Sequence, residues 1–128
     1  MNADRFRKAA ESKDVDAMVD ALTADVVLNS PVAFKPFRGR DEVRLLFTVL
    51  MQVFEDFRYV GEFDSEDGSV LRFRCRVGTR DVEGIDLLHF TADGLCDDFT
   101  VMVRPLSAAI ALAEAVGPRL AEAGYVKS

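Results

Sequence analysis

The sequence predicts an α+β fold, in which a strongly curved antiparallel sheet wraps around one long helix and forms a cone with an internal apolar cavity. Three observations support this prediction. Apolar residues recur at helical spacing over 41–54, alternate with polar residues over 70–77, and flank a turn within 83–104. Because the chain has 128 residues, one domain spanning 1–128 is expected.

Two short helices are expected at the start of the chain. The first spans residues 4–12 and turns Phe6 inward, and the second begins after Asp14, a suitable N-cap. A strand over 25–30 follows. It ends at Pro31, because proline has no N–H to donate to a β-ladder.

The long helix over 41–54 comes next. Its apolar residues extend around most of its circumference: Val43, Leu45, Leu46, Phe47, Val49, Leu50, Met51, Val53 and Phe54. A helix with so wide an apolar surface contacts protein on two sides or covers a cavity. A last helix is expected from Ser107 to residue 115 or 116, with Gly117-Pro118 breaking it before a short second piece.

Four strands between these two helices form the predicted meander. The first two, over 57–63 and 70–77, are joined by a turn at 65–68. The second strand alternates most clearly, with one row made of Leu71, Phe73, Cys75 and Val77 and the other of Val70, Arg72, Arg74 and Arg76. This alternation indicates an antiparallel sheet with one buried face.

The other two strands lie within 83–104 and meet at a tight turn, where Asp93-Gly94 supplies the positive φ that such a turn needs. Alternation gives two inward-facing rows: Asp86, Leu88 and Phe90 in one, Phe99, Val101 and Val103 in the other. Asp86 is thus a lone carboxyl among apolar neighbours. Such surroundings disfavour the charged form and raise the pKa, as in many functional carboxyls in clefts.

Composition argues against several classes of function. The net charge of −6 and the pI near 4.7 do not suit nucleic-acid binding, which needs a basic surface. No apolar run approaches the roughly 20 residues that cross a bilayer, and no apolar signal-peptide core is present, so a cytoplasmic protein without membrane contact is expected. Cys75 and Cys96 lack neighbours at metal-ligand spacing, so no disulfide scaffold, metal or other cofactor is expected.

Four segments carry a resemblance to a known family: KDVDAM at 13–18, ADVVLNSP at 24–31, RGRDEV at 38–43 and GIDLLHFTADG at 84–94. In their order and spacing they resemble the nuclear-transport-factor-2-like (NTF2-like, cystatin-like) superfamily, especially its SnoaL-like and ketosteroid-isomerase-like members. The resemblance covers nearly the whole chain. It implies the cone fold and leaves the activity open, because the superfamily contains isomerases, dehydratases, cyclases, epoxide hydrolases and members without known activity.

The resemblance to ketosteroid isomerases is partial at the site. Those enzymes have a general-base Asp where this sequence has Ser30, a tyrosine donor on the first helix where it has Phe6, and a protonated Asp that matches Asp86. Epoxide-hydrolase relatives have an Arg where Gly84 stands and a second Asp where Val101 stands. A polyketide cyclase of this superfamily needs one acid/base Asp, and Asp86 is the residue that would serve.

We therefore expect Asp86 to be the catalytic residue of a cavity that binds a small apolar molecule. The alternative is a structural carboxylate that is hydrogen-bonded to Tyr59, Ser30 or water. The residues expected to line the cavity are Phe6, Ser30, Phe47, Phe54, Tyr59, Phe73, Leu88, Phe90, Phe99 and Val101.

Two functions from different classes follow. The first is an isomerase, cyclase or hydratase that acts on an apolar carbonyl compound, with Asp86 as acid or oxyanion donor. The second is a non-catalytic binding or dimerisation module, which the missing base and tyrosine favour. Ile85, Leu87 and Met102 face away from the cavity, so a homodimer that packs sheet against sheet would bury them.

Overall fold

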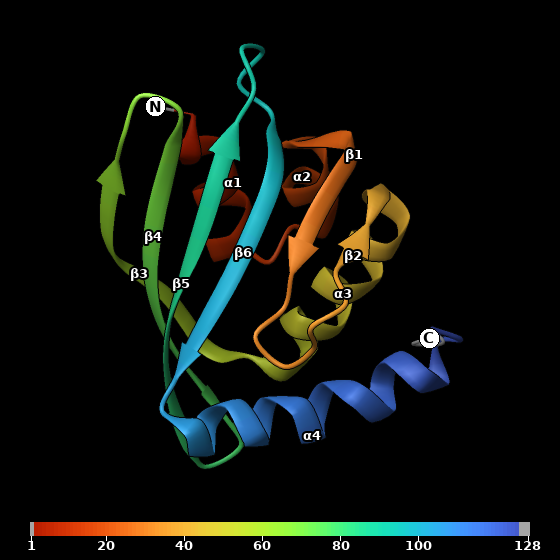
Figure 1. Ribbon diagram of the computed structural model, residues 1–128. Helices are drawn as coiled ribbons and strands as arrows, with labels where there is room; N and C mark the ends of the chain where they lie inside the picture. Colours follow the sequence, from red (N-terminus) through yellow and green to blue (C-terminus); the bar gives the residue numbers. More distant parts are fainter. Residues whose placement is uncertain (1, 126–128) are drawn as a thin grey trace.

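The computed structural model describes residues 2–125, which form a six-stranded sheet and four helices (Figure 1). In chain order the elements are α1 (Ala3–Glu11), α2 (Val15–Asp20), β1 (Leu22–Asn29), β2 (Phe37–Arg38), α3 (Gly39–Val53), β3 (Glu55–Asp64), β4 (Gly68–Val77), β5 (Arg80–Phe90), β6 (Cys96–Arg104) and α4 (Leu106–Glu122). The strands lie in the order β2-β1-β6-β5-β4-β3.

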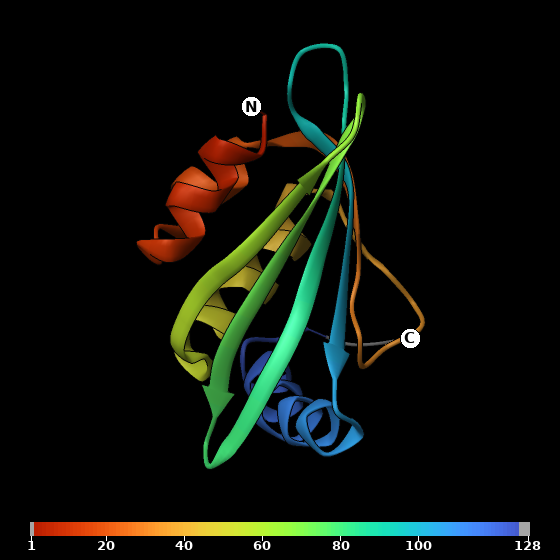
Figure 2. The same cartoon turned by 90° about the vertical axis from the view of Figure 1, so that its left-hand side faces the viewer.

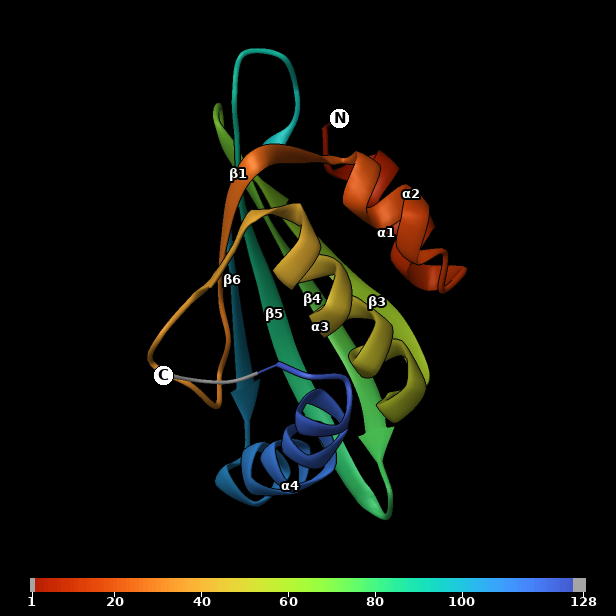
Figure 3. The same cartoon turned by 90° about the vertical axis from the view of Figure 1, so that its right-hand side faces the viewer.

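The sheet is curved, and the helices fill its concave side. Figure 2 views it from the edge strand β3, with α1 and α3 on the concave side and α4 across the lower end. Figure 3 shows α3 running obliquely over that concave side, between the α1–α2 pair and α4. The predicted α+β arrangement of a curved sheet around a long helix is confirmed.

Strand pairing follows the predicted meander with one exception. Strands β3 to β6 pair antiparallel in sequence, whereas β1 pairs with β6 in parallel, with Leu28 opposite Phe99. The predicted antiparallel sheet therefore contains one parallel pair. Parallel neighbours need a long connection, and the chain between β1 and β6 supplies one that includes α3 and the meander.

The helices and strands bury the faces that their sequence patterns predict. Asp14 caps α2 by accepting a hydrogen bond from the Ala17 N–H at 3.1 Å. On the concave side the buried residues include Phe6 of α1, Phe47 of α3 and the row Leu71, Phe73, Cys75 and Val77 of β4. The arginines of β4 face outward and pair with acids, among them Arg74 with Glu83 at 2.8 Å.

The last helix corrects the sequence-based prediction. Pro105 precedes its first residue, and the helix continues through Gly117 and Pro118 as far as Glu122. Gly117 has no Cβ to clash with the proline ring, which removes much of the usual penalty on helical backbone before proline. Burial of Val116 and Leu120 on either side of the pair offsets the hydrogen bond that Pro118 cannot donate. Within residues 2–125, none of the helices is long and apolar enough to cross a membrane.

Candidate functional site

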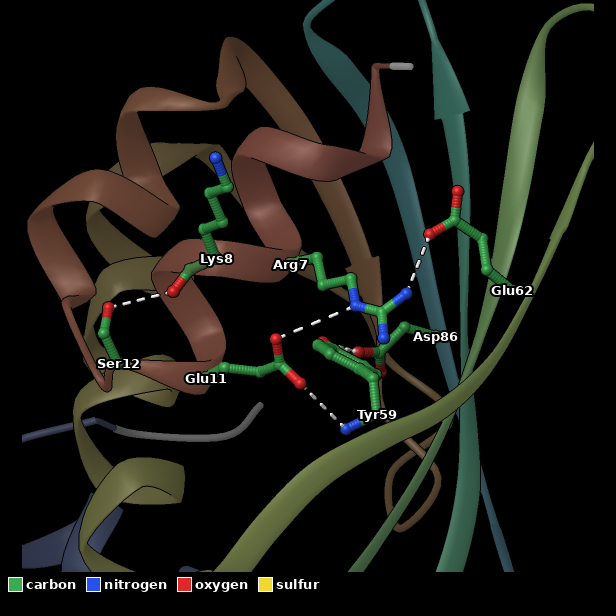
Figure 4. A network of polar contacts seen from close by, with 7 residues as sticks. All are labelled: Arg7, Lys8, Glu11, Ser12, Tyr59, Glu62 and Asp86. Atoms are coloured by element: carbon green, nitrogen blue, oxygen red, sulfur yellow. Dashed lines mark hydrogen bonds and ion pairs between the residues drawn. The ribbon is translucent and has the colours of Figure 1, made fainter.

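The chemically distinctive feature of the concave side is a hydrogen bond between two buried polar residues. The Tyr59 hydroxyl donates to Asp86 Oδ2 at 2.6 Å, and only 6% of either residue is exposed (Figure 4). Tyr59 lies on β3 and Asp86 on β5, with β4 between them. Their β4 partners are Phe73 and Leu71, so the tyrosine reaches the carboxyl across a strand of apolar side chains.

Burial sets the protonation of this pair. Loss of hydration raises the pKa of Asp86 from 3.8 to about 7, and the hydrogen bond from Tyr59 opposes this rise. Burial, followed by the charge of Asp86, raises the pKa of Tyr59 well above 10.0. Asp86 therefore exchanges between a proton acceptor and a proton donor near neutral pH, while Tyr59 stays protonated.

Aromatic rings enclose the Tyr59–Asp86 pair. The rings of Phe6 and Phe99 lie 5.0 Å apart, and Phe57 stacks on Phe73 at 5.1 Å. The cavity that the pair borders has a volume of about 30 Å³. That volume accommodates a water-sized group, whereas ligand pockets span roughly 300–1,000 Å³. In this conformation the cavity at Asp86 is therefore too small for the ligand that the sequence predicts it to bind.

The predicted lining residues divide into three groups. Those that border the cavity at Asp86 are Phe6, Phe47, Phe54, Tyr59, Phe73, Phe99 and Val101. Leu88 and Phe90 are buried on β5 but do not border it. Ser30 borders a different cavity, beside α4, and is not brought together with Asp86.

Sequence reasoning missed the charged residues that fasten α1 above Tyr59. The Arg7 guanidinium carbon lies 5.9 Å from the centroid of the Tyr59 ring. Arg7 pairs with Glu62 at 3.2 Å and with Glu11 at 3.7 Å, and Glu11 accepts a hydrogen bond from the Tyr59 N–H at 3.3 Å (Figure 4). The spacing of Arg7 and Glu11 along the helix was the available signal. We call the three residues Arg7, Glu11 and Glu62 the ionic clasp.

Within the described part of the chain, no three His, Cys, Asp or Glu side chains are placed to hold a metal ion. The ionisable side chains that border the cavity are the carboxyl of Asp86 and the phenol of Tyr59, and the other lining residues are apolar.

Comparison with known proteins assigns the family. The model of the SnoaL-like domain matches residues 3–98. The chain belongs to the SnoaL-like family. No curated protein matches the sequence of this SnoaL-like protein at a significant level.

Solved structures place this SnoaL-like protein among NTF2-like folds. A bacterial protein with a cystatin-like fold from Silicibacter pomeroyi DSS-3 has a TM-score of 0.90 at 31% identity, over 94% of this chain and 85% of the other. A steroid delta-isomerase from Pseudomonas aeruginosa has a TM-score of 0.89 at 37% identity, over 95% and 90%. The epoxide hydrolase/cyclase-like enzyme SalBIII, which takes part in pyran ring formation in the polyether salinomycin, shares the fold at 20% identity, with a TM-score of 0.67 over 83% and 88%.

Proposed function

We propose that this SnoaL-like protein binds a small, largely apolar carbonyl compound in its cone and polarises the carbonyl oxygen with protonated Asp86. The observation that carries the proposal is the 2.6 Å bond between Tyr59 and Asp86 inside an aromatic enclosure. The similarity to a steroid delta-isomerase at 37% identity supports a ligand of this class. We also propose a cytoplasmic location, with which the buried free thiols of Cys75 and Cys96 are compatible.

The single carboxyl narrows the reaction type. Protonated Asp86 donates its O–H to the carbonyl oxygen, and Tyr59 holds the carboxyl in place while negative charge develops on that oxygen. A proton shift between two carbons needs a separate base. Ser30, which stands where ketosteroid isomerases have that base, borders another cavity. The site is therefore suited to cyclisation or hydration. In these reactions one carboxyl, here Asp86, donates a proton to the carbonyl oxygen and then accepts a proton from the attacking hydroxyl or water.

Binding requires the cavity of about 30 Å³ to widen. Met18 and Met51 border it, and their unbranched side chains repack easily. Phe6 borders it from α1, which the ionic clasp joins to β3. Partly exposed ion pairs contribute about 1 kcal/mol or less, so the ionic clasp adds little to the cost of moving α1, which comes mainly from exposing its buried face. We propose this movement as the route to Asp86.

The first test uses α,β-unsaturated ketones, whose ultraviolet absorption moves to longer wavelength when the oxygen accepts a strong hydrogen bond. We expect the wild type to produce this shift near neutral pH and to lose it as Asp86 ionises above its pKa of about 7. In Asp86→Ala we expect affinity to fall about tenfold and any turnover to disappear. Asp81→Ala, on the same strand but exposed, is the matched control. Unchanged binding and turnover in Asp86→Ala would refute the assignment.

A homodimeric module is the second candidate function, and the outer face of the sheet favours it. Phe63, Leu87 and Met102 are 62%, 41% and 52% exposed on that face. Pairing places Phe63 beside Val70 and Val70 beside Leu87, which makes an apolar row across three strands. We propose that a second copy of the chain covers this row.

Light scattering during size-exclusion chromatography tests the homodimer. The wild type should have the mass of a dimer, and Leu87→Arg combined with Met102→Glu should have the mass of a monomer. Leu106→Arg changes a residue that is 77% exposed on α4 and should leave the dimer intact. A monomeric wild type at high concentration would exclude this interface.

A further inference from the structure

An apolar pocket beside the C-terminal helix is distinct from the cavity at Asp86. It has a volume of about 470 Å³ and lies between the chain that follows β1, one residue of α3 and one face of α4. None of its lining residues borders the cavity at Asp86. Its volume is within the range of ligand pockets, roughly 300–1,000 Å³. We call it the α4 pocket.

Small residues on α4 keep the α4 pocket open. Residues at positions 113, 116, 117, 120 and 121 border it, and this spacing is that of a single helix face. Three of the five are Ala113, Gly117 and Ala121, and a Cβ on Gly117 would meet no atom within 4 Å. The same helix face packs tightly where it carries Val116 and Leu120, which are both buried.

Two aromatic side chains also border the α4 pocket, and they pack against each other. Phe37 of β2 stacks on Tyr125 with ring centroids 4.9 Å apart and an angle of 20° between the rings. The Tyr125 N–H donates to the Leu120 carbonyl at 2.9 Å, which fixes the residue at the end of α4. A lining that combines aromatic rings with small aliphatic residues suits a planar, apolar ligand.

The polar groups of the α4 pocket are hydroxyls. Ser30 Oγ accepts a hydrogen bond from the Val32 N–H at 3.2 Å, so its own hydrogen is free to donate. Burial raises the pKa of Tyr125 above 10.0, with a smaller contribution from Glu42, so the phenol stays neutral. Although 30% of the chain is charged, every residue that lines the α4 pocket is uncharged. Such a lining accepts an uncharged ligand and disfavours an ionised one.

We propose that the α4 pocket is a second binding site, for an uncharged, largely apolar small molecule that carries one hydrogen-bond acceptor for the Ser30 hydroxyl. The site is independent of the chemistry proposed for Asp86. It also gives the Ser30 hydroxyl a role as a hydrogen-bond donor to a ligand, although Ser30 stands where ketosteroid isomerases have their general base.

Fluorescence titration with prodan, an uncharged naphthalene ketone whose emission moves to the blue in apolar surroundings, tests the proposal on the full chain. We expect saturable binding to the wild type. Ala113→Leu and Ala121→Leu extend side chains from the lining face, and each should weaken binding by about tenfold. Ser30→Ala should weaken it by about fivefold. Thermal melts of all variants check that they remain folded.

Two further variants locate the probe. Ala123→Leu makes the same change as Ala121→Leu two residues further on, outside the α4 pocket, and should bind prodan like the wild type. Asp86→Asn should keep the prodan binding that Ala121→Leu weakens, because Asp86 lies outside the α4 pocket. Loss of binding in Asp86→Asn with normal binding in Ala121→Leu would move the probe to the other cavity and overturn this inference while supporting the proposed function. Absence of saturable binding, or equal loss in Ala121→Leu and Ala123→Leu, would also overturn it.

Discussion

Asp86→Asn should make the folded protein more stable than the wild type at about pH 8, by on the order of 2 kcal/mol. Burial raises the pKa of Asp86 in the folded state from 3.8 to about 7. Between these values the folded protein holds a proton on Asp86 that the unfolded chain has released. The wild type therefore loses stability as pH rises through this window and levels off above it.

The size of the effect follows from the shift. Three pH units at 1.36 kcal/mol per unit give about 4 kcal/mol as the cost of the buried charge. An asparagine amide at this position offsets part of the gain, because its buried N–H groups gain no partner, at about 1–3 kcal/mol.

Urea unfolding at a series of pH values measures this prediction. The difference in unfolding free energy between Asp86→Asn and the wild type should grow from about pH 4 to about pH 7 and then stay constant. Asp81→Asn makes the same change at an exposed position of the same strand and should show almost no such growth. Tyr59→Phe removes the bond that lowers the pKa of Asp86, so that pKa should rise further above 7. A difference curve for Asp86→Asn that is flat across this range would show that Asp86 is not protonated by burial.

Gly84→Ala should destabilise the protein by about 3 kcal/mol. A Cβ at position 84 would lie 2.4 Å from Phe73 Cζ and 2.6 Å from the Met102 carbonyl oxygen. Real side chains do not approach so closely, and a backbone oxygen cannot move aside cheaply, so both the ring and the sheet must shift. Phe73 also borders the cavity at Asp86, so we expect the aromatic rings around Asp86 to pack less closely in this variant.

The matched control for this substitution is Gly61→Ala. A Cβ there would meet only the flexible Arg72 side chain, at 3.6 Å, which is ordinary contact. Chemical denaturation should separate the two variants clearly. Equal stability of Gly84→Ala and Gly61→Ala would mean that Phe73 does not fill the space at position 84. The arginine that epoxide-hydrolase relatives have at this position would meet the same obstruction.

Periodicity was sufficient to predict most of the fold. The alternation in β4 and the wide apolar surface of α3 reflect burial directly, so both elements were predicted close to their observed bounds. The course of α4 was not, because Gly117-Pro118 ends most helices and only the tertiary packing of Val116 and Leu120 carries this one through. The parallel pairing of β1 with β6 is a long-range contact with no local pattern.

The candidate site was predictable only in part. The alternation of side chains along the strand correctly predicted that Asp86 faces the concave side. Tyr59 was among its suggested hydrogen-bond partners. The size of the cavity depends on how rings such as Phe57 and Phe73 pack against one another, which spacing along a strand does not encode. The resemblance to ketosteroid isomerases grouped Ser30 with Asp86, whereas the structure assigns them to different cavities.

On the proposed route past α1, salt concentration should affect access to Asp86, because the ionic clasp joins α1 to β3. Arg7 and Glu11 are about one-third exposed, so dissolved ions reach the charges that join α1 to β3. The Debye length shortens from about 10 Å at 0.1 M salt to about 3 Å at 1 M. Association of a ligand at Asp86 should therefore be faster at about 1 M salt than at about 0.1 M salt. Electrostatic steering of a charged ligand would show the opposite dependence, because salt slows it.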